Sequence, residues 1–383
     1  MHTNPFVFGG VALDASFTDR EEEVAELAAD MRNGQDVVVY APRRYGKSSL
    51  VLKAAQEAIA DGALVAYCDL MRTPTKERLA AALARTIYSD LDTTTGHAIE
   101  RARALFRGLR VTPTIEVDPD DASLRFTFSA GRRREAIDDT IEALLELPAS
   151  LAAERKRRMV LVFDEFQEIV ALDPAFPNLL RAVFQRQRGV SHVYLGSKRH
   201  VLDRIFNDRN EPFWRSAKQL EIGVIARPAF ADFLEARFTA TDRSIDAEAV
   251  ERLLDATGGH PYATQELAYF VWELVPDGFV AHASDVEEGI GKALLSEHNH
   301  LASLWDDAPQ TQRLVMLALT DEPTAAIYSE PYHARHELPP KSSLQVAMRA
   351  LVQKEVVGRD ADGEYRIVEP FFADWLRRER ARP

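Results

Sequence analysis

The sequence is short of several features that mark particular classes of protein. A single cysteine, Cys68, excludes an internal disulfide and favours a reducing compartment. No run of 18 apolar residues occurs, and residues 1–6 lack the basic start and apolar run of a signal peptide. We therefore expect a cytoplasmic protein with no membrane-spanning segment.

The chain also lacks an excess of positive charge. Its 47 lysines and arginines face 60 acidic residues, which gives a formal net charge of −13. That sign disfavours wrapping nucleic acid over the whole surface, although it does not exclude a local basic patch. A length of 383 residues, 46% of them hydrophobic, indicates a globular protein of two or three domains.

Buried strands alternate with helices in the first part of the chain, which predicts a parallel sheet covered by helices. Period-two alternation over residues 109–131, around a turn rich in aspartate, predicts a β-hairpin inserted into this α/β region. Residues 228–300 have a helical pattern throughout. The expected strands are 36–41, 63–69, 158–164, 190–196 and 219–225.

Residues 41–48 follow the P-loop pattern G-x-x-x-x-G-K-[ST], with Ala41 in place of the first glycine. A predicted buried strand precedes the motif and a helix follows it, so loop N–H groups and a helix N-terminus form an anion site. We expect Lys47 to contact the β- and γ-phosphates of ATP and Ser48 to ligate Mg²⁺. The predicted cofactor-binding residues here are Pro42, Arg43, Arg44, Tyr45, Gly46, Lys47, Ser48 and Ser49.

A second motif, residues 160–165, is an apolar strand that ends in two adjacent carboxylates, as in a Walker B motif. By itself this pattern is also typical of a strand that meets a helix N-cap. Its place on another predicted core strand, about 117 residues after Lys47, favours nucleotide chemistry. Asp164 would then hold Mg²⁺, and Glu165 would polarise the attacking water as a general base.

Together, residues 17–23, 41–50 and 163–168 resemble the archaeal-type ATPase family, of the STAND branch of AAA-like P-loop ATPases. The doubled arginine before Gly46 is characteristic of that family. The resemblance implies an α/β fold with a P-loop (AAA-like) parallel-sheet core. In that core the Walker B strand is not next to the P-loop strand. The resemblance further implies a helical lid and a C-terminal winged-helix domain. The expected boundaries are 1–226, 227–304 and 305–383.

The resemblance also implies roles for residues outside the two motifs. Residues 194–197 resemble the end of the sensor 1 strand, so Ser197 would lie near the γ-phosphate or the attacking water. The turn at 259–261 resembles a lid motif, which would place His260 and Pro261 near the base and ribose. In similar ATPases the segment at residues 6–9 covers the adenine, and core packing is an equal alternative for it.

An arginine finger would supply positive charge as the γ-phosphoryl group leaves. Arg215 is the first candidate because it lies just before the fifth strand, and Lys198 and Arg199 are alternatives. Arg43 and Arg44 could contact phosphate or a partner. The simpler interpretation of each is a solvated basic residue that pairs with nearby acids.

The pattern of the last part of the chain predicts three helices followed by a hairpin, which is the order of elements in a winged helix. In such folds the third helix contacts the DNA bases. Residues 305–383 carry 11 basic against 13 acidic side chains. The third helix, 341–355, has Lys341, Arg349 and Lys354 as its basic residues. Its apolar stripe is Leu344, Ala347, Met348, Leu351 and Val352.

Two functions fit these features. The first is a switch ATPase, in which slow ATP hydrolysis with Mg²⁺ controls an unknown protein partner or self-assembly. The second is a DNA-binding ATPase that resembles origin-recognition initiators and contacts duplex DNA through the winged helix. Salt-dependent DNA binding would separate them.

Overall fold

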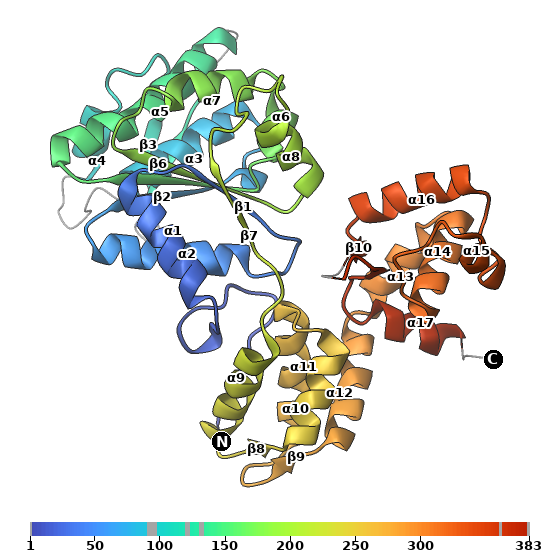
Figure 1. Ribbon diagram of the computed structural model, residues 1–383. Coiled ribbons are helices and arrows are strands. Elements are labelled where there is room, and N and C mark those ends of the chain that lie inside the picture. Colours follow the sequence, from blue (N-terminus) through green and yellow to red (C-terminus); the bar gives the residue numbers. More distant parts are fainter. Residues whose placement is uncertain (1, 90–97, 119–122, 130–133, 360–361, 381–383) are drawn as a thin grey trace. The chain divides into compact units, whose positions relative to one another are not determined.

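The computed structural model describes residues 2–89, 98–118, 123–129, 134–359 and 362–380 (Figure 1). The chain divides into two compact units. The sheet unit comprises residues 20–43 and 47–223. The helical unit comprises residues 224–383 together with residues 1–19 and 44–46. The predicted core began at residue 1, whereas residues 1–19 group with the helical unit.

The sheet unit is built on a five-stranded parallel sheet with the order β2-β5-β6-β1-β7. Three strands are buried along their whole length, because helices cover both faces of a parallel sheet. β6 lies between β1, which leads into the P-loop, and β5, which carries the Walker B carboxylates. This confirms the predicted α/β core. The strands are β1 (Val37–Tyr40), β2 (Leu64–Asp69), β5 (Met159–Asp164), β6 (Val190–Gly196) and β7 (Lys218–Glu221).

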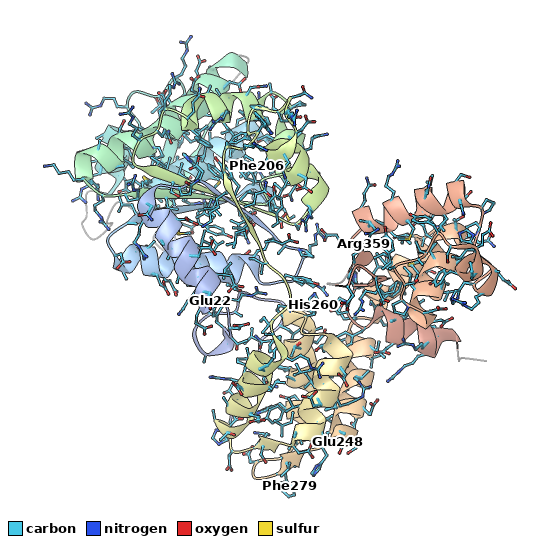
Figure 2. The ribbon with its side chains drawn as sticks, in the orientation of Figure 1. Glu22, Phe206, Glu248, His260, Phe279 and Arg359 are labelled. Atoms are coloured by element: carbon cyan, nitrogen blue, oxygen red, sulfur yellow. The ribbon has the colours of Figure 1, made fainter. Side chains whose placement is uncertain are left out.

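Helices and a core of aromatic rings complete this unit. Phe166 packs against Tyr194, Phe206 and Phe213 with ring centroids between 4.6 and 5.8 Å apart (Figure 2). Tyr194 is on β6 and Phe166 follows β5, so this cluster joins the segments that carry Glu165 and Ser197. The helices are α1 (Glu21–Asn33), α2 (Lys47–Ala60), α3 (Lys76–Ser89), α4 (Ala98–Leu105), α5 (Arg134–Arg155), α6 (Glu168–Leu172), α7 (Phe176–Phe184) and α8 (Arg199–Asn207).

The predicted inserted hairpin is present as β3 (Thr114–Val117) paired antiparallel with β4 (Leu124–Thr127). Leu124 and Phe126 are buried and Arg125 and Thr127 are exposed, as period-two alternation requires. β4 packs against α3, with Phe126 against Tyr88. Residues 119–122 of the predicted turn lie outside the described part of the chain.

The helical unit begins with a bundle that includes the N-terminal segment. Phe6 is buried against Phe233 and Phe238, so it is a core residue. The side chain of Gln265 accepts a hydrogen bond from the N–H of Val7. A short parallel pair, β8 (Ser244–Ile245) with β9 (Val280–Ala281), was missed because two residues are too few to show alternation. The helices are α9 (Arg227–Thr239), α10 (Ala247–Thr257), α11 (Pro261–Leu274), α12 (Ala283–Ser296) and α13 (His298–Asp306).

The same unit ends in the predicted order of helices and hairpin. On α16, Leu344, Ala347, Met348 and Leu351 are buried as expected. Val352, the last residue of the apolar stripe, is 45% exposed near the helix end. No helix in the described ranges is long and apolar enough to cross a membrane. The elements are α14 (Gln310–Asp321), α15 (Glu330–Arg335), α16 (Lys341–Gln353), β10 (Val357–Arg359), β11 (Tyr365–Ile367) and α17 (Phe372–Arg380).

Candidate nucleotide site

The P-loop connects β1 to α2. Gly46 has a φ of 81°, a left-handed conformation that favours glycine. Ala41 is not among the residues with positive φ, which explains why alanine is tolerated where the pattern has glycine. Lys47 is buried, and its Nζ donates to the carbonyl oxygens of Ala41 at 3.0 Å and Pro42 at 3.1 Å. The ammonium group is therefore held over the start of the loop.

Ser48, on the first turn of α2, reaches the end of β5. Its Oγ donates to Oδ2 of Asp164 at 3.0 Å. Mg²⁺ takes oxygen ligands octahedrally at about 2.1 Å, so neighbouring ligands lie roughly 3 Å apart. The two oxygens therefore have the spacing of adjacent ligands of one Mg²⁺ ion, and they fit the predicted metal site.

Tyr67, on β2, was not predicted from the sequence as part of the site. Its hydroxyl donates to the same Oδ2 of Asp164. Burial and the neighbouring Asp164 raise the pKa of Tyr67, so its hydroxyl stays a hydrogen-bond donor. Only the pairing of β2 with β5, in which Tyr67 stands opposite Val162, brings the two side chains together.

Glu165 follows β5 directly and has a φ of 52°, which is uncommon for a residue with a Cβ. Its Oε2 accepts a hydrogen bond from Oγ of Ser197 at 3.0 Å and another from Nε2 of Gln167. Strained backbone of this kind persists where the surroundings fix it, and it clusters at functional sites. The structure thus brings together the two residues predicted as general base and sensor.

Gln167 is a second residue that the sequence did not reveal. It is 3% exposed, and it holds the carboxylate of Glu165. A Cβ on Gly196 would lie 2.3 Å from its Oε1 and 2.7 Å from Cδ1 of Leu202. Only glycine fits at the end of β6, and the one sequence signal for this packing is a glycine immediately before Ser197.

The candidate arginine finger lies elsewhere on the sheet unit. Arg215 precedes β7, whose first residue, Lys218, pairs with Val37 at the start of β1. Because the strands are parallel, Arg215 lies at the amino edge of the sheet, whereas the P-loop leaves the carboxyl edge. Its side chain is exposed, with Cζ 5.3 Å from the ring centroid of Trp214. Within one sheet unit, Arg215 is therefore at the opposite edge from Glu165.

The alternative basic residues are engaged in ion pairs. Lys198 pairs with Glu168 at 2.9 Å, and Arg199 forms a two-pronged pair with Glu221. Both pairs are partly exposed, and they support the simpler interpretation of surface residues that pair with nearby acids.

Two further residues of the predicted P-loop site differ in exposure. Arg43 is exposed, and Ser49 is buried on α2.

Residues 258–261 form the turn that starts α11 in the helical unit (Figure 2). Gly259 has a φ of 74°, and a Cβ there would lie 2.5 Å from the carbonyl oxygen of Ile225. His260 caps the helix, its Nδ1 accepting from the N–H of Ala263 at 3.3 Å, and Pro261 is in the first turn. Burial, followed by nearby Arg44, lowers the pKa of His260 to about 3, so the ring is neutral. The motif thus has a structural explanation in helix capping.

Residues 44–46 of the loop make their contacts within the helical unit. The Arg44 guanidinium lies 3.2 Å from Oε1 of Glu297 and 4.2 Å from the ring centroid of Tyr262. The ring of Tyr45 meets that of His260 edge-on at 4.6 Å. Arg44 is therefore paired with a carboxylate.

Glu266 on α11 lies near this cluster and was not singled out from the sequence. Its side chain is fully buried, and neither carboxylate oxygen has a hydrogen-bond partner among the described residues. Burial, followed by repulsion from Glu297, raises the pKa of Glu266 to about 8. This carboxyl is therefore protonated at neutral pH.

Family models match parts of this chain, and solved structures are similar to it. The model of a probable winged helix domain matches residues 299–378. The Walker-type ATPase PABY2304 of Pyrococcus abyssi is similar in structure, with a TM-score of 0.66 at 14% identity, over 96% of this chain and 97% of that one. The ORC2 protein of Aeropyrum pernix, solved with ADPNP and ADP, has a TM-score of 0.55 at 15% identity, over 97% and 96%.

At such identities the two structures show a shared fold alone. No match was found among curated proteins. A family model described as an ATPase domain predominantly from Archaea matches residues 17–267, which is more than half of the chain and includes both nucleotide motifs. Together with the fold, this match identifies the chain as a member of the archaeal-type ATPase family that carries a winged helix domain at its C-terminal end.

Proposed function

We propose that this protein binds ATP with Mg²⁺ at the P-loop and hydrolyses it slowly, as a switch of the STAND class that controls a protein partner or its own assembly. The observation that carries the proposal is a pair of hydrogen bonds at the carboxyl edge of the sheet. Ser48 bonds to Asp164, and Ser197 bonds to Glu165. Metal ligands and a positioned base are the parts that phosphoryl transfer requires.

Each residue has a role in this proposal. Lys47 contacts the β- and γ-phosphates, while Ser48 and Asp164 hold Mg²⁺, which would neutralise charge on the phosphates. Glu165 accepts a proton from the attacking water, and Ser197 orients that carboxylate or the water. His260 and Pro261 take the base and ribose, with His260 neutral as its low pKa requires.

Arg215 acts in the proposal from a neighbouring molecule, since it lies at the amino edge of its own sheet. An isolated chain would then lack the charge that an arginine finger supplies in the transition state, a contribution of about 10³-fold or more in rate. Slow turnover by the monomer and faster turnover in an assembly follow from this placement.

The experiment is to measure phosphate release from ATP over a hundredfold range of protein concentration, with Mg²⁺ and with EDTA. We expect release that requires Mg²⁺ and a rate per chain that increases with concentration. An Arg215→Ala variant should lose that increase, whereas Arg209→Ala, in the same loop, should keep it. Release that is indifferent to EDTA would contradict the metal site, and a rate per chain that is constant would contradict action in trans.

Duplex DNA binding through α16 is the second candidate. The exposed residues of this helix include Lys341, Ser342, Gln345 and Arg349, whose side chains are of types that contact phosphates and base edges. A polarisation titration with a labelled duplex at 20 to 200 mM salt tests it. Binding that weakens steeply with salt and is lost in Arg349→Ala would favour this function, and no binding at 20 mM salt would eliminate it.

A further inference from the structure

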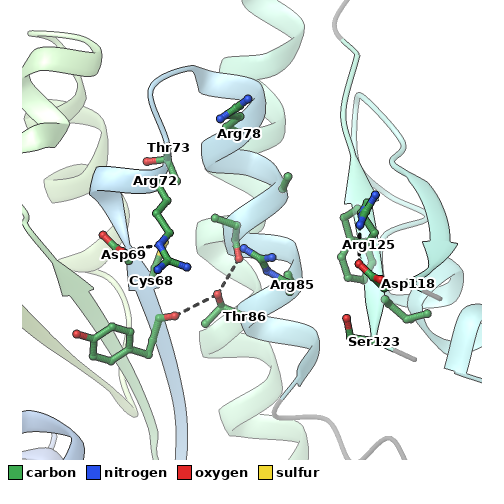
Figure 3. A pocket seen from close by; sticks show the side chains of 15 residues that line it. Cys68, Asp69, Arg72, Thr73, Arg78, Arg85, Thr86, Asp118, Ser123 and Arg125 are labelled. Atoms are coloured by element: carbon green, nitrogen blue, oxygen red, sulfur yellow. Dashed lines mark hydrogen bonds and ion pairs between the residues drawn. The ribbon is translucent and has the colours of Figure 1, made fainter. Parts of the chain in front are cut away.

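A cavity of about 690 Å³ lies at the outer side of β2 in the sheet unit (Figure 3). The end of β2, the helix α3 and the inserted hairpin form its walls. Cavities of roughly 300–1,000 Å³ are typical of small-molecule sites. The P-loop does not contribute to the lining, but Tyr67, which bonds to Asp164, lines the cavity as well.

Four arginines line this cavity in a chain whose net charge is −13. Figure 3 shows Arg72, Arg78 and Arg85 on one side and Arg125 on the other. Arg72 pairs with Asp69 at 3.2 Å and Arg125 with Asp118 at 2.5 Å. These two carboxylates offset two of the four positive charges, which leaves a net charge of about +2 among the described residues that line the cavity.

Arg78 and Arg85 have no such carboxylate. Neither side chain makes a hydrogen bond or ion pair with any residue in the described ranges. They lie seven residues apart on α3, which places them two turns apart on the same face, about 10 Å along the axis. Ala81 and Ala82 stand between them, and their small side chains leave the space between the two guanidinium groups open.

The remaining lining suits a ligand that is polar at more than one point. Thr86 and Ser123 place hydroxyl groups at the wall, and Leu124 and Phe126 of the hairpin supply apolar surface. Arginine is the side chain best matched to phosphate, because its planar donors can bind two oxygens at once. Two arginines about 10 Å apart favour a ligand with several linked phosphates over a single small anion.

The cavity also adjoins the end of the sheet that carries the Walker B carboxylates. Asp69, at its wall, stands opposite Asp164 in the pairing of β2 with β5. The Oγ1 of Thr86 donates to the carbonyl oxygen of Tyr67 at 3.3 Å, and the hydroxyl of Tyr67 donates to Asp164. Because Tyr67 lines the cavity, a ligand there would lie beside a direct partner of that carboxylate.

We propose that this arginine-lined cavity is a second ligand site, which binds a small molecule carrying two or more linked phosphates through Arg78 and Arg85. The proposal does not depend on ATP hydrolysis at the P-loop. Inorganic tripolyphosphate is a suitable probe, since it has linked phosphates and no base.

The test is calorimetric titration of tripolyphosphate into the full-length Lys47→Ala variant, in which the P-loop is disabled. We expect one binding site per chain. Adding Arg78→Glu and Arg85→Glu should weaken that binding at least tenfold. The matched control adds Arg103→Glu and Arg107→Glu, exposed residues in and just after α4 that do not line the cavity, and should change affinity less than twofold.

Several results would overturn the proposal. One is no tripolyphosphate binding by Lys47→Ala up to millimolar concentration, and another is equal loss in the pocket and control variants. If the charge reversals unfold the protein, as a thermal melt would reveal, Arg78→Gln with Arg85→Gln replaces them under the same expectation. Binding of a single-stranded oligonucleotide through these arginines, without tripolyphosphate binding, would make the cavity part of a nucleic-acid groove and also refute the proposal.

The outcome is distinguishable from failure of the proposed ATPase function. ATP binding by the wild type and its loss in Lys47→Ala concern the P-loop alone. A chain that does not bind ATP but binds tripolyphosphate through Arg78 and Arg85 would refute the ATPase proposal and support the second site. A chain that binds ATP at the P-loop but whose Lys47→Ala variant does not bind tripolyphosphate would support the ATPase proposal and refute the second site.

Discussion

The carboxyl edge of the sheet and the exposed face of α16 are both places where a ligand is expected, and they are built differently. At the sheet edge, Asp164 accepts hydrogen bonds from Ser48 and Tyr67, and the backbone of Glu165 adopts a left-handed conformation. On α16, Gln345, Val346 and Arg349 are exposed on an ordinary helix. The first region fixes its side chains before any ligand arrives, and the second leaves them in solvent.

This difference indicates which function each region can have alone. Catalysis benefits from groups that are oriented in advance, since reorganisation during the reaction costs rate. A surface of solvated side chains can serve several partners, and its specificity depends on the partner it meets. The side chains at the sheet edge are thus oriented in advance, as a reaction requires, whereas those on α16 are not.

We expect the largest effect from Lys47→Ala, which tests whether the carboxyl edge of the sheet is the nucleotide site. Removing the ammonium group should reduce ATP affinity by about a hundredfold or more, since charge-assisted bonds to phosphate are strong. Titration of a fluorescent ATP analogue measures it. Lys53→Ala, on the same helix, is the control, and comparable affinities of the two variants would refute the site.

We expect a smaller effect from Gln167→Ala, a loss of kcat. This variant tests whether catalysis depends on the position of the Glu165 carboxylate. Without the amide donor the carboxylate loses one of its two side-chain hydrogen bonds, so kcat should fall about tenfold while ATP affinity stays the same. Steady-state kinetics separates kcat from binding. Gln185→Ala, exposed after α7, should be unchanged, and an unchanged kcat for Gln167→Ala would show that the contact is only structural.

Glu266→Gln tests whether a buried carboxyl in the helical unit makes the stability of the protein depend on pH. The pKa of Glu266 is raised from its ordinary value of 4.5 to about 8, so the folded state keeps a proton that the unfolded state releases. Stability should therefore fall as pH rises from about 4.5 to 8. The glutamine variant should lose much of this slope and melt roughly 5 °C higher at pH 8.

Thermal melts at pH 5 and pH 8 measure this effect. Glu273→Gln, an exposed residue on the same helix, should keep the wild-type slope. If Glu266→Gln retains the wild-type slope, the buried carboxyl is not responsible for the pH dependence.

The smallest effect is expected from Arg349→Ala on α16. The residue is exposed on a helix of the helical unit and belongs to neither nucleotide motif, so ATP turnover should change less than twofold. The same phosphate-release assay measures it. A large loss of turnover would show that the winged helix takes part in the reaction and that the contrast between the two regions is wrong.

The sequence predicted what depends on local pattern. The parallel sheet, the hairpin at 109–131 and the helix order of the winged helix follow from periodicity and turn residues, and the structure has them. The sequence did not predict contacts that depend on strand pairing or on the conformation of turns. Tyr67 belongs to the site because the pairing of β2 with β5 brings it there, and no spacing along the chain encodes that proximity. Gln167 is only two residues from Glu165, but its contact depends on the turn that follows β5. The two-residue strands β8 and β9 were missed for lack of length.

The most direct test of the central claim is phosphate release by the wild type and Glu165→Gln with ATP and Mg²⁺, alongside ATP affinity. We expect Glu165→Gln to bind ATP as tightly as the wild type and to release phosphate at least a hundredfold more slowly. Glu168→Gln, which changes an acid paired with Lys198, should behave as the wild type. Equal release by the wild type and Glu165→Gln would show that the carboxyl edge of the sheet is not the catalytic centre.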